Sequence, residues 1–394
     1  MDERQAISRR TLLGRAVAGA AALGLGVVGS PGAGGVAPSS SLAKKAGPGL
    51  LPDPTRPVAT DLIPQIENIV IVMMEHHSFD NMLDLLGRGD GLTLDASGHP
   101  TNTNPWSKKS VFAPPGKNAT VRSFPMPSPC QEGSYPYNTW EAVWVSYAGG
   151  KMSGFVESQS GPVSMGYFEP SVLPFTNSLA ATFPVCDRYF CSVGAQTYPN
   201  RRFLVAGTSL GLLTDDLQTA NPDVPPNGTI VEALTKYGIS WKNYSSSLPS
   251  SAIWYYQVAD ATYLTHLDKI SAFYADAAAG TPPSISLVDP DFNNQSQENP
   301  QDVPYGEQFL SEVVQAVMAS PQWPKTMLVW CYDESGGYYD HVVPPTRRGR
   351  STATASGSPP AWSPRTPSRA TCRRWCTTTP RCSGWSSPSG TCRP

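Results

Sequence analysis

Four carboxylates of this chain come at the ends of short apolar runs. They belong to Glu75, Asp289, Asp333 and Glu334. Carboxylates that meet at one place repel one another unless a positive charge lies between them. Hard divalent cations suit carboxylate oxygens, and an imidazole extends the choice to transition metals. These residue types therefore favour a site for one or more divalent metal ions.

The stretch 72-VMMEHHSFDNML-83 allows two compatible interpretations. As local structure it is a helix start, with Ser78 as the N-cap and Asp80 near the positive end of the helix dipole. As chemistry, His76 and the carboxylate before it point into a metal site. His77 has no evident partner in the sequence, so we expect a structural role for it.

The stretch 186-CDRYFCSVGAQTYPNRRFLVAGTS-209 brings a hydroxyl, an amide and a guanidinium into one turn, at Thr197, Asn200 and Arg201. A hydroxyl nucleophile needs a metal or a base to lower its effective pKa, and a phosphate needs arginine or backbone donors. This turn supplies both kinds of group. Spacing alone favours the alternative, in which a proline starts a helix and Thr197 is its cap.

A third polar stretch, 330-WCYDESGGYYDHVVPP-345, follows the last apolar run. The acidic pair Asp333 and Glu334 follows the apolar run. Two glycines then allow a tight bend, and Asp340 and His341 come next. A polar loop around a Gly-Gly turn is the alternative interpretation. Two acidic groups around one such turn at a strand end favour a functional site.

Strands and helices alternate along the chain, which predicts the α/β fold class. Strand-like runs cover 67–75, 239–244, 284–292 and 326–334, and helical patterns cover 229–238 and 306–320. Such alternation is typical of a largely parallel, buried sheet. Active sites of these sheets form outside the carboxyl ends of the strands. We therefore expect the four carboxylates at one edge.

The composition is that of a soluble globular protein with long ordered loops. The 394 residues are 40% apolar and 15% charged and include 40 prolines. A net charge of −2 gives no reason to expect nucleic acid as a partner. The eight cysteines lack the spacing of a zinc site, since no CxxC occurs.

The N-terminal segment 8-SRRTLLGRAVAGAAALGLGVVG-29 resembles a twin-arginine export signal, with paired arginines before a short Gly- and Ala-rich apolar run. A membrane anchor is the alternative, but the run is short and weakly apolar for a bilayer core of about 30 Å. We predict a signal peptide and linker over residues 1–43. The protein is then secreted or associated with the cell envelope.

Four stretches, taken together, resemble the bacterial phosphoesterase family of the alkaline-phosphatase-like superfamily. They are 75-EHHSFD-80, 196-QTYPNR-201, 287-LVDPDF-292 and 332-YDESGGYYDH-341. The family contains phosphatidylcholine-type phospholipases C and related acid phosphatases. The resemblance runs from about Ile66 to Pro345, in order and at sensible spacing.

The resemblance implies an α/β/α sandwich around a mostly parallel sheet, with metal-assisted attack of a hydroxyl on phosphorus. The implied metal ligands are Glu75, His76, Asp333 and Glu334. Thr197 matches the nucleophile, and a phospho-threonine intermediate is then hydrolysed by water. We assign substrate binding to Asn200, Arg201, Asp340 and His341.

The chain departs from the family pattern at several positions. Position 76, commonly Asn in the family, is His here and still offers a nitrogen ligand. The family often has His where this chain has Asn138, Trp144, Asn299 and Ser335. These changes remove possible phosphate donors or general acids. They weaken the resemblance with respect to a particular substrate more than with respect to the general reaction.

The last part of the chain has a different composition. After His341 there are nine arginines and no acidic residue or lysine. Read from the third base of the Trp375 codon, the codons of 375-WCTTTP-380 permit Val-Tyr-Asp-His-Thr, which is like a block that the family has there. We predict a frameshift just after Pro345, so that 346–394 is read out of frame. The alternative is a genuine disordered basic tail.

The predicted organisation is thus a signal and linker (1–43), a catalytic domain that is incomplete at its C-terminus (44–345), and an aberrant tail (346–394). The leading prediction is an exported phospholipase C that cleaves phosphatidylcholine-like lipids, with transient contact to a membrane surface. Aromatic loops at 134–140 and 253–257 are candidates for that contact, although loop aromatics are more often packed. The alternatives are an acid phosphatase on soluble monoesters and a catalytically impaired binding protein.

Overall fold

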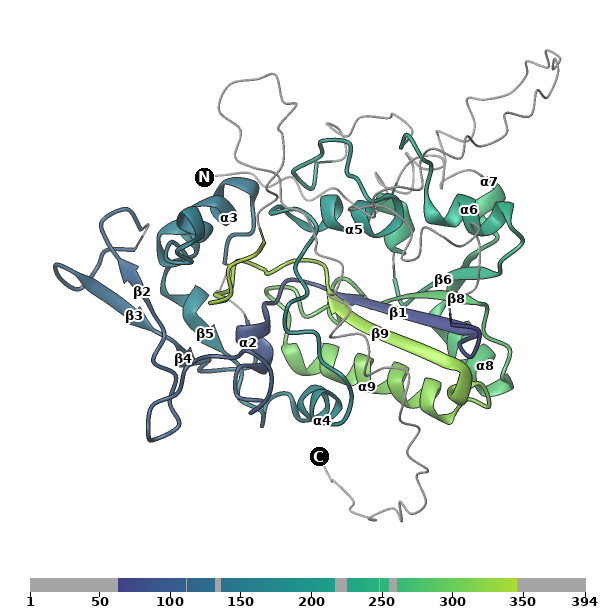
Figure 1. Cartoon of the computed structure of the whole chain (residues 1–394), viewed down its shortest axis with the longest axis horizontal. Coiled ribbons are helices and arrows are strands. Elements are labelled where there is room, and N and C mark those ends of the chain that lie inside the picture. The colour runs from purple at the N-terminus through teal and green to yellow at the C-terminus, as the bar shows by residue number, and fades with distance from the viewer. Residues whose placement is uncertain are drawn as a thin grey trace, which may run out of the picture. The chain divides into compact units, whose positions relative to one another are not determined.

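A sheet of five parallel strands forms the centre of the fold. In this computed structural model the strand order is β7-β6-β8-β1-β9, and each neighbouring pair runs parallel (Figure 1). The strands are β1 (Asn68–Met74), β6 (Trp241–Ser245), β7 (Leu267–Lys269), β8 (Ile285–Asp289) and β9 (Thr326–Tyr332). The predicted strand runs correspond to β1, β6, β8 and β9, whereas the short strand β7 was not predicted.

The structure describes residues 63–110, 112–131, 136–216, 225–247, 249–254 and 261–345. All of them belong to one of the two units into which the chain divides, the one made of Met1–Gly35 and Asp61–Ser363. The predicted signal and linker (1–43) and the tail (346–394) lie outside the described residues. Within the described ranges, no helix has the length and apolar content needed to cross a bilayer.

One face of the sheet is covered by three helices, which lie below it in Figure 1. They are α4 (Pro174–Thr182), α8 (Ile270–Ala279) and α9 (Val303–Ala319). Val70 and Val72 of β1 pack on this side in one buried cluster with Val313 and Val317 of α9. Because successive strand residues point to opposite faces, the residue between the two valines, Ile71, points to the other face.

The opposite face is covered by α5 (Thr197–Ala206) and α6 (Ile230–Lys236). Val205 of α5 and Leu234 of α6 belong to a second buried cluster with Trp241 of β6 and Leu287 of β8, and Ile71 packs against it. A helix layer thus lies on each side of a parallel sheet. The predicted α/β/α sandwich is confirmed.

Both predicted helices form, close to the predicted limits. Thr229 is the N-cap of α6, and its side chain and that of Glu232 make a reciprocal capping box. Helix α9 begins at Val303 and not at Gly306, because Pro304 fits the first turn of a helix, where no backbone donor is needed.

A smaller region of short elements lies beside the carboxyl ends of β1 and β9 (Figure 1). Its elements are β2 (Thr103–Trp106), β3 (Ala119–Arg122), β4 (Phe124–Pro125), α3 (Trp140–Tyr147) and β5 (Gly166–Tyr167). The remaining helices are α2 (Phe79–Leu83), which follows β1, and α7 (Ala261–Leu264), which precedes β7. Phe155, Met165 and Tyr167 form a buried cluster with Tyr339, which lies on the loop after β9. This cluster anchors that loop.

Strand β9 is an edge strand among the described residues, although its sequence is that of a central one. All seven of its residues are at least partly exposed, and Val329 is 36% exposed. Strand β1, beside it, is mostly buried. An apolar edge strand of this length normally needs a cover or a partner strand. The frameshift predicted after Pro345 stays a prediction.

If residues 346–394 are read out of frame, as we propose, restoring the frame after Pro345 should raise the melting temperature of the protein. A continuation that covers the edge of β9 buries apolar surface, and an increase on the order of 5 °C or more is expected for a domain of this size. Thermal melts of the two purified chains, followed by circular dichroism, measure the difference. Equal melting temperatures, or a gene in which no shift restores an acidic and apolar-patterned continuation, would exclude the frameshift.

Candidate functional site

The four strand-end carboxylates meet at one edge of the sheet. Glu75 follows β1, Asp289 ends β8, and Asp333 and Glu334 follow β9. These three strands are neighbours in the sheet, so parallel pairing carries their carboxyl ends to the same place. Each of the four side chains belongs to a residue that is at most 5% exposed. The expected gathering of carboxylates is therefore present and deeply buried.

The guanidinium of Arg201 lies between three of these carboxylates. Its Nη2 is 3.4 Å from Glu75 Oε1, its Nη1 is 3.7 Å from Asp289 Oδ1, and its Nε is 3.3 Å from Asp333 Oδ2. Nη2 also donates a hydrogen bond to the carbonyl oxygen of Met73, at 3.1 Å. Arg201 is 1% exposed, so its charge interacts with the buried carboxylates and not with solvent.

One guanidinium does not neutralise this much buried acid. Burial raises the pKa of Glu75 well above its usual value and Glu298 adds to the rise, although Arg201 opposes it. Burial likewise raises the pKa of Glu334 to about 7, against the attraction of His76. The raised pKa values mean that ionising these groups costs free energy until further positive charge arrives. A divalent cation supplies such charge.

The imidazole of His76 lies between the carboxylates of Glu334 and Glu298. Its Nε2 is 3.2 Å from Glu334 Oε1, and its Nδ1 is 3.6 Å from Glu298 Oε1. Burial alone lowers the pKa of an imidazole, but Glu298 and Glu334 together with two further carboxylates raise that of His76 to about 10. The surrounding carboxylates therefore favour the positively charged form of the His76 imidazole.

The backbone at His76 is held in the left-handed region, with φ at 70°. Few residue types tolerate this conformation, and Asn and His are among the more frequent ones. The His76 N–H donates to Asp333 Oδ1 at 3.3 Å, which fixes the turn against the other loop. At Gly336, a Cβ atom would lie 1.9 Å from the carbonyl oxygen of His76, so this approach requires glycine. Glycine at position 336 thus allows the loop after β9 to pack closely against the His76 turn.

Thr197 is the first residue of α5, and Gln196 is the N-cap. The structure therefore contradicts the interpretation of Thr197 as the cap. Its Oγ1 lies 2.9 Å from His76 Nε2, and the residue is 5% exposed. The N-terminus of a helix carries partial positive charge, which favours an oxyanion or a phosphate beside Thr197.

Two further residues complete the group, and the sequence alone did not identify them as ligands. Glu298, on the loop between β8 and α9, comes within reach of His76 and Glu75. Asn138, just before α3, donates from Nδ2 to Glu334 Oε1 at 2.6 Å and lies 3.3 Å from His76 Nε2. The only sequence signal was that the family often has His at position 138. Nothing in its surroundings singled out Glu298.

The donor set fits a divalent metal ion. Two groups of possible ligands share His76: Glu75 with Glu298, and Asp333 with Glu334. Within each group one ligand atom per residue lies within 4.8 Å of the others. Carboxylate oxygens with one imidazole nitrogen suit Mn²⁺, Zn²⁺ or a related ion. All four predicted ligands belong to these groups, and the group with Asp333 is the one beside Thr197.

Asn200 and Arg201 make contacts that support the loop and the carboxylates. Asn200 donates from Nδ2 to the carbonyl oxygens of Val193, Ala195 and Gln196, and its Oδ1 accepts from the Val193 N–H. The guanidinium of Arg201 is engaged by the buried acids. The substrate-binding role that we predicted for these two residues finds no support in these contacts.

Asp340 and His341 lie in a different group from Thr197. His341 Nδ1 is 2.8 Å from Asp80 Oδ2, and His341 Nε2 is 3.2 Å from Asp90 Oδ1. Asp340 and His341 come within metal-ligand range of Asp80. Their predicted role in substrate binding stays a prediction.

His77 is a structural residue, as expected. Its Nδ1 lies 2.6 Å from Asn81 Oδ1, and its Nε2 lies 2.9 Å from the carbonyl oxygen of Gln297. The ring stacks on Tyr338 and meets Tyr332 edge on. Burial lowers the pKa of His77 to about 4, although the hydrogen bonds to the Gln297 carbonyl oxygen and to Asn81 oppose the shift.

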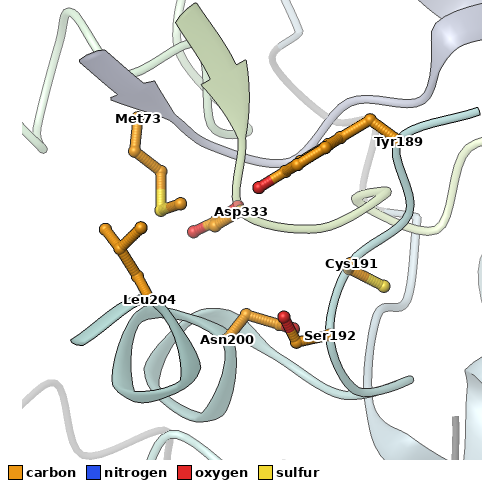
Figure 2. Close-up of a pocket in the computed structure, with 7 residues that line it drawn as sticks. All are labelled: Met73, Tyr189, Cys191, Ser192, Asn200, Leu204 and Asp333. Atoms are coloured by element: carbon orange, nitrogen blue, oxygen red, sulfur yellow. The ribbon is translucent and has the colours of Figure 1, made fainter. Parts of the chain in front are cut away.

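A small hollow opens beside Asp333 on the α5 side of the site (Figure 2). Its lining residues include Tyr189, Cys191 and Ser192 from the segment before α5 and Leu204 from α5 itself. Figure 2 shows the Tyr189 side chain reaching across toward Asp333. Burial raises the pKa of the Cys191 thiol to about 12, and the carboxylates of Glu334 and Asp333 add to the rise.

We predict that Arg201→Met destabilises the fold by about 3–5 kcal/mol, because the exchange leaves three buried carboxylates without their cation. Urea unfolding in chelator, followed by circular dichroism, measures the loss. Arg122→Met is the matched control, since its ion pair with Asp95 is exposed and contributes little. If both variants unfold at the same midpoint, Arg201 does not hold the carboxylates together.

Comparison with known proteins places the chain among phosphoesterases. A model of the "Phosphoesterase family" matches residues 66–371, a range that ends within the segment for which we predict a shifted reading frame. Non-specific phospholipase C1 of Arabidopsis thaliana is 31% identical over 310 residues, covering 72% of this chain and 55% of that protein.

Bacterial phospholipases C match a similar share of this chain as the plant protein does. Non-hemolytic phospholipase C of Pseudomonas aeruginosa is 27% identical, covering 74% of this chain and 46% of its own length. Phospholipase C A of Mycobacterium tuberculosis (strain H37Rv) is 28% identical, covering 71% of this chain and 60% of its own length. The chain spans about half the length of the curated relatives that it matches. Because the matched range includes most of the chain and every strand end of the site, the chain belongs to the phosphoesterase family.

Proposed function

We propose that this chain is a metal-dependent phosphoric ester hydrolase of the phospholipase C type, with Thr197 as its nucleophile. The observation that carries the proposal is the 2.9 Å contact between Thr197 Oγ1 and His76 Nε2, inside a group of buried acids. The family match and the names of the relatives support the same chemistry.

The metal ion would be held by His76, Asp333 and Glu334, with Glu75 and Glu298 adjacent. When bound, such an ion lowers the pKa of a nearby hydroxyl and offsets the charge that develops on a phosphoryl group. The chain's own residues would supply the nucleophile and orient the ligands. Thr197 presents its hydroxyl at a helix N-terminus, and Asn138 orients Glu334 through a 2.6 Å hydrogen bond.

The reaction is then a double displacement. Thr197 Oγ1 forms a bond to phosphorus while the bond from phosphorus to the ester oxygen breaks, and the alcohol leaves. Water next attacks the phosphorus of the phospho-threonine, which releases the phosphate product and restores the hydroxyl. Buried Arg201 keeps Glu75 and Asp333 in place through both steps.

The proposed substrate is a phosphatidylcholine-like lipid, which would give diacylglycerol and a phosphorylated head group. The relatives' printed names, all phospholipases C, support a lipid diester. A phosphatase acting on soluble monoesters is the second candidate, because the family that the chain resembles contains acid phosphatases as well as phospholipases C. Rates on a phosphocholine diester and on a phosphate monoester, measured side by side, separate the two.

We predict that Thr197→Val lowers the rate of phosphoester cleavage by at least about 10³-fold, because the isosteric side chain lacks the nucleophile. Thr197→Ser keeps a hydroxyl and should retain measurable activity. Steady-state rates with Mn²⁺ or Zn²⁺, measured on folded protein, test both variants.

Thr182→Val is the matched control for this experiment. Its hydroxyl bonds to the Ser178 carbonyl oxygen on the exposed side of α4, so its loss should leave the rate unchanged. Metal-dependent cleavage that survives Thr197→Val at the wild-type rate is incompatible with the proposed nucleophile. Absence of cleavage with every divalent metal, for both this chain and its frame-corrected form, favours a binding protein.

We also propose export by the twin-arginine route, on the evidence of the N-terminal sequence alone. Residues 1–43 fused to a folded fluorescent reporter should carry it out of the cytoplasm of a twin-arginine-competent bacterium. Changing both Arg9 and Arg10 to Lys should leave the reporter inside. Fractionation that finds the Lys-Lys fusion outside as often as the parent fusion contradicts this route.

A further inference from the structure

The loop between β2 and β3 concentrates positive charge in a chain that is slightly acidic overall. Residues 96–131 contain three lysines, one arginine and no acidic residue, whereas the whole chain has a net charge of −2. The arginine, Arg122, pairs with Asp95. None of the lysines forms an ion pair within the part of the chain that the structure describes. They are Lys108, Lys109 and Lys117, and all three are exposed.

An aromatic side chain stands among these lysines. Strands β2 and β3 pair antiparallel, with Trp106 opposite Ala119, so the loop joins the two strands of a hairpin. We call residues 107–110 and 112–118 the hairpin loop. Phe112 lies in its middle and is 53% exposed. Part of its ring is covered by Gly161, because a Cβ atom there would come 2.2 Å from the ring. The rest of the ring faces solvent.

The hairpin loop is held in shape by its own hydrogen bonds. The indole N–H of Trp106 donates to the Phe112 carbonyl oxygen at 2.8 Å, and the Phe112 N–H donates to Ser110 Oγ at 3.3 Å. The Lys109 N–H donates to Ser107 Oγ at 3.2 Å. The Ser107 hydroxyl in turn donates to the carboxylate of Glu157. A loop that is ordered in advance loses little conformational entropy when it binds a partner.

A short series of contacts connects the hairpin loop to the Thr197 site. Phe112 lies against Gly161, and the neighbouring Ser160 accepts a hydrogen bond from the Tyr137 N–H at 2.8 Å. The next residue, Asn138, donates to Glu334 of the site at 2.6 Å. Figure 1 shows β2 and β3 in the smaller region beside the carboxyl ends of β1 and β9. A surface that docks on the hairpin loop therefore lies on the side of the molecule that carries the site.

We propose that the hairpin loop is a docking surface for a phospholipid bilayer that carries anionic head groups. The three lysines are attracted to the negative surface of such a bilayer. The exposed part of the Phe112 ring enters the boundary between head groups and acyl chains, where burial of apolar surface is favourable. This inference deepens the proposed function, on which it rests for the benefit of docking close to the Thr197 site.

The alternative partner of a basic loop with an aromatic side chain is a single-stranded nucleic acid. Proteins that bind such strands use a positively charged groove along the backbone and several aromatic side chains on which successive bases stack. The hairpin loop instead gathers its three lysines around one exposed ring at the end of a hairpin. This compact arrangement favours a flat charged surface over an extended strand.

The first test is cosedimentation of the full chain with vesicles of phosphatidylglycerol and phosphatidylcholine. The Thr197→Val background is used so that the lipid is not consumed. Because each lysine near an anionic surface strengthens binding by roughly fivefold, the double variant Lys108→Gln, Lys109→Gln should bind roughly 20-fold more weakly than its parent. The difference should shrink at high salt, which screens the lysines, and on vesicles of phosphatidylcholine alone.

The matched control is the double variant Lys236→Gln, Lys325→Gln. It has the same net charge, but its exposed lysines precede β6 and β9, at the opposite end of the sheet from the site. It should bind vesicles as its parent does. The arginines after His341 are common to all variants, so their contribution to binding cancels in each comparison.

The aromatic contact has a test of its own. Phe112→Ala should weaken vesicle binding by at least about fivefold, because less apolar surface is buried. Leu264→Ala is the control, since Leu264 is 51% exposed and precedes β7. Circular dichroism establishes that each variant is folded. Hydrogen exchange followed by mass spectrometry should show slower exchange of the hairpin loop in the parent when the anionic vesicles are added.

Equal vesicle binding by the parent and by the folded Lys108→Gln, Lys109→Gln variant, with unchanged exchange of the hairpin loop, overturns the proposal. Loss of binding to a labelled single-stranded RNA, with vesicle binding unchanged, also overturns it and assigns the loop to nucleic acid. Both readouts are independent of cleavage, so failure of the proposed function leaves them interpretable. In protein with Thr197 intact, the lysine variant should cleave a soluble phosphocholine diester at the wild-type rate.

Discussion

The contact between Arg201 and three buried carboxylates is the interaction on which the rest of the site depends. A parallel sheet brings the carboxyl ends of β8, β1 and β9 together, and each of these ends carries an acid. Like charges at such short range, removed from water, oppose the folding of the sheet that gathers them. Helix α5 inserts one guanidinium among them, 1% exposed and within 3.7 Å of each. The same helix begins at Thr197, so it carries both the balancing charge and the proposed nucleophile.

The remaining charge explains why the site favours a metal. The single charge of Arg201 does not neutralise Glu334 and Glu298 as well. The raised pKa of His76 favours a positive charge on the imidazole beside these two carboxylates. Backbone constraints help to hold this arrangement. His76 is in a left-handed conformation, its carbonyl oxygen leaves no room for a side chain at Gly336, and its N–H bonds to Asp333. Ligands from β1 and β9 are therefore fixed relative to each other before any ion binds.

Much of this could be predicted from the sequence, because strand periodicity and strand ends are local signals. The strand runs before Glu75 and Asp333 were sufficient to place both acids at one edge. The inward direction of Arg201 was not predictable. An arginine shortly after a proline gives the same sequence pattern whether its guanidinium faces a substrate or the protein core. Glu298 lies in a long polar loop whose path depends on tertiary contacts. The contact between His341 and Asp80 was not predictable either, because it depends on the path of the loop after the Gly-Gly bend.

The central claim is that one divalent ion lies among His76, Asp333 and Glu334, beside Thr197. Anomalous diffraction from crystals of the protein grown with Mn²⁺ tests it most directly. The account predicts a peak within about 2.0–2.6 Å of ligand atoms of these three residues, the range of carboxylate and imidazole coordination. A well-ordered site with no peak there, while Mn²⁺ occupies other positions, would contradict it.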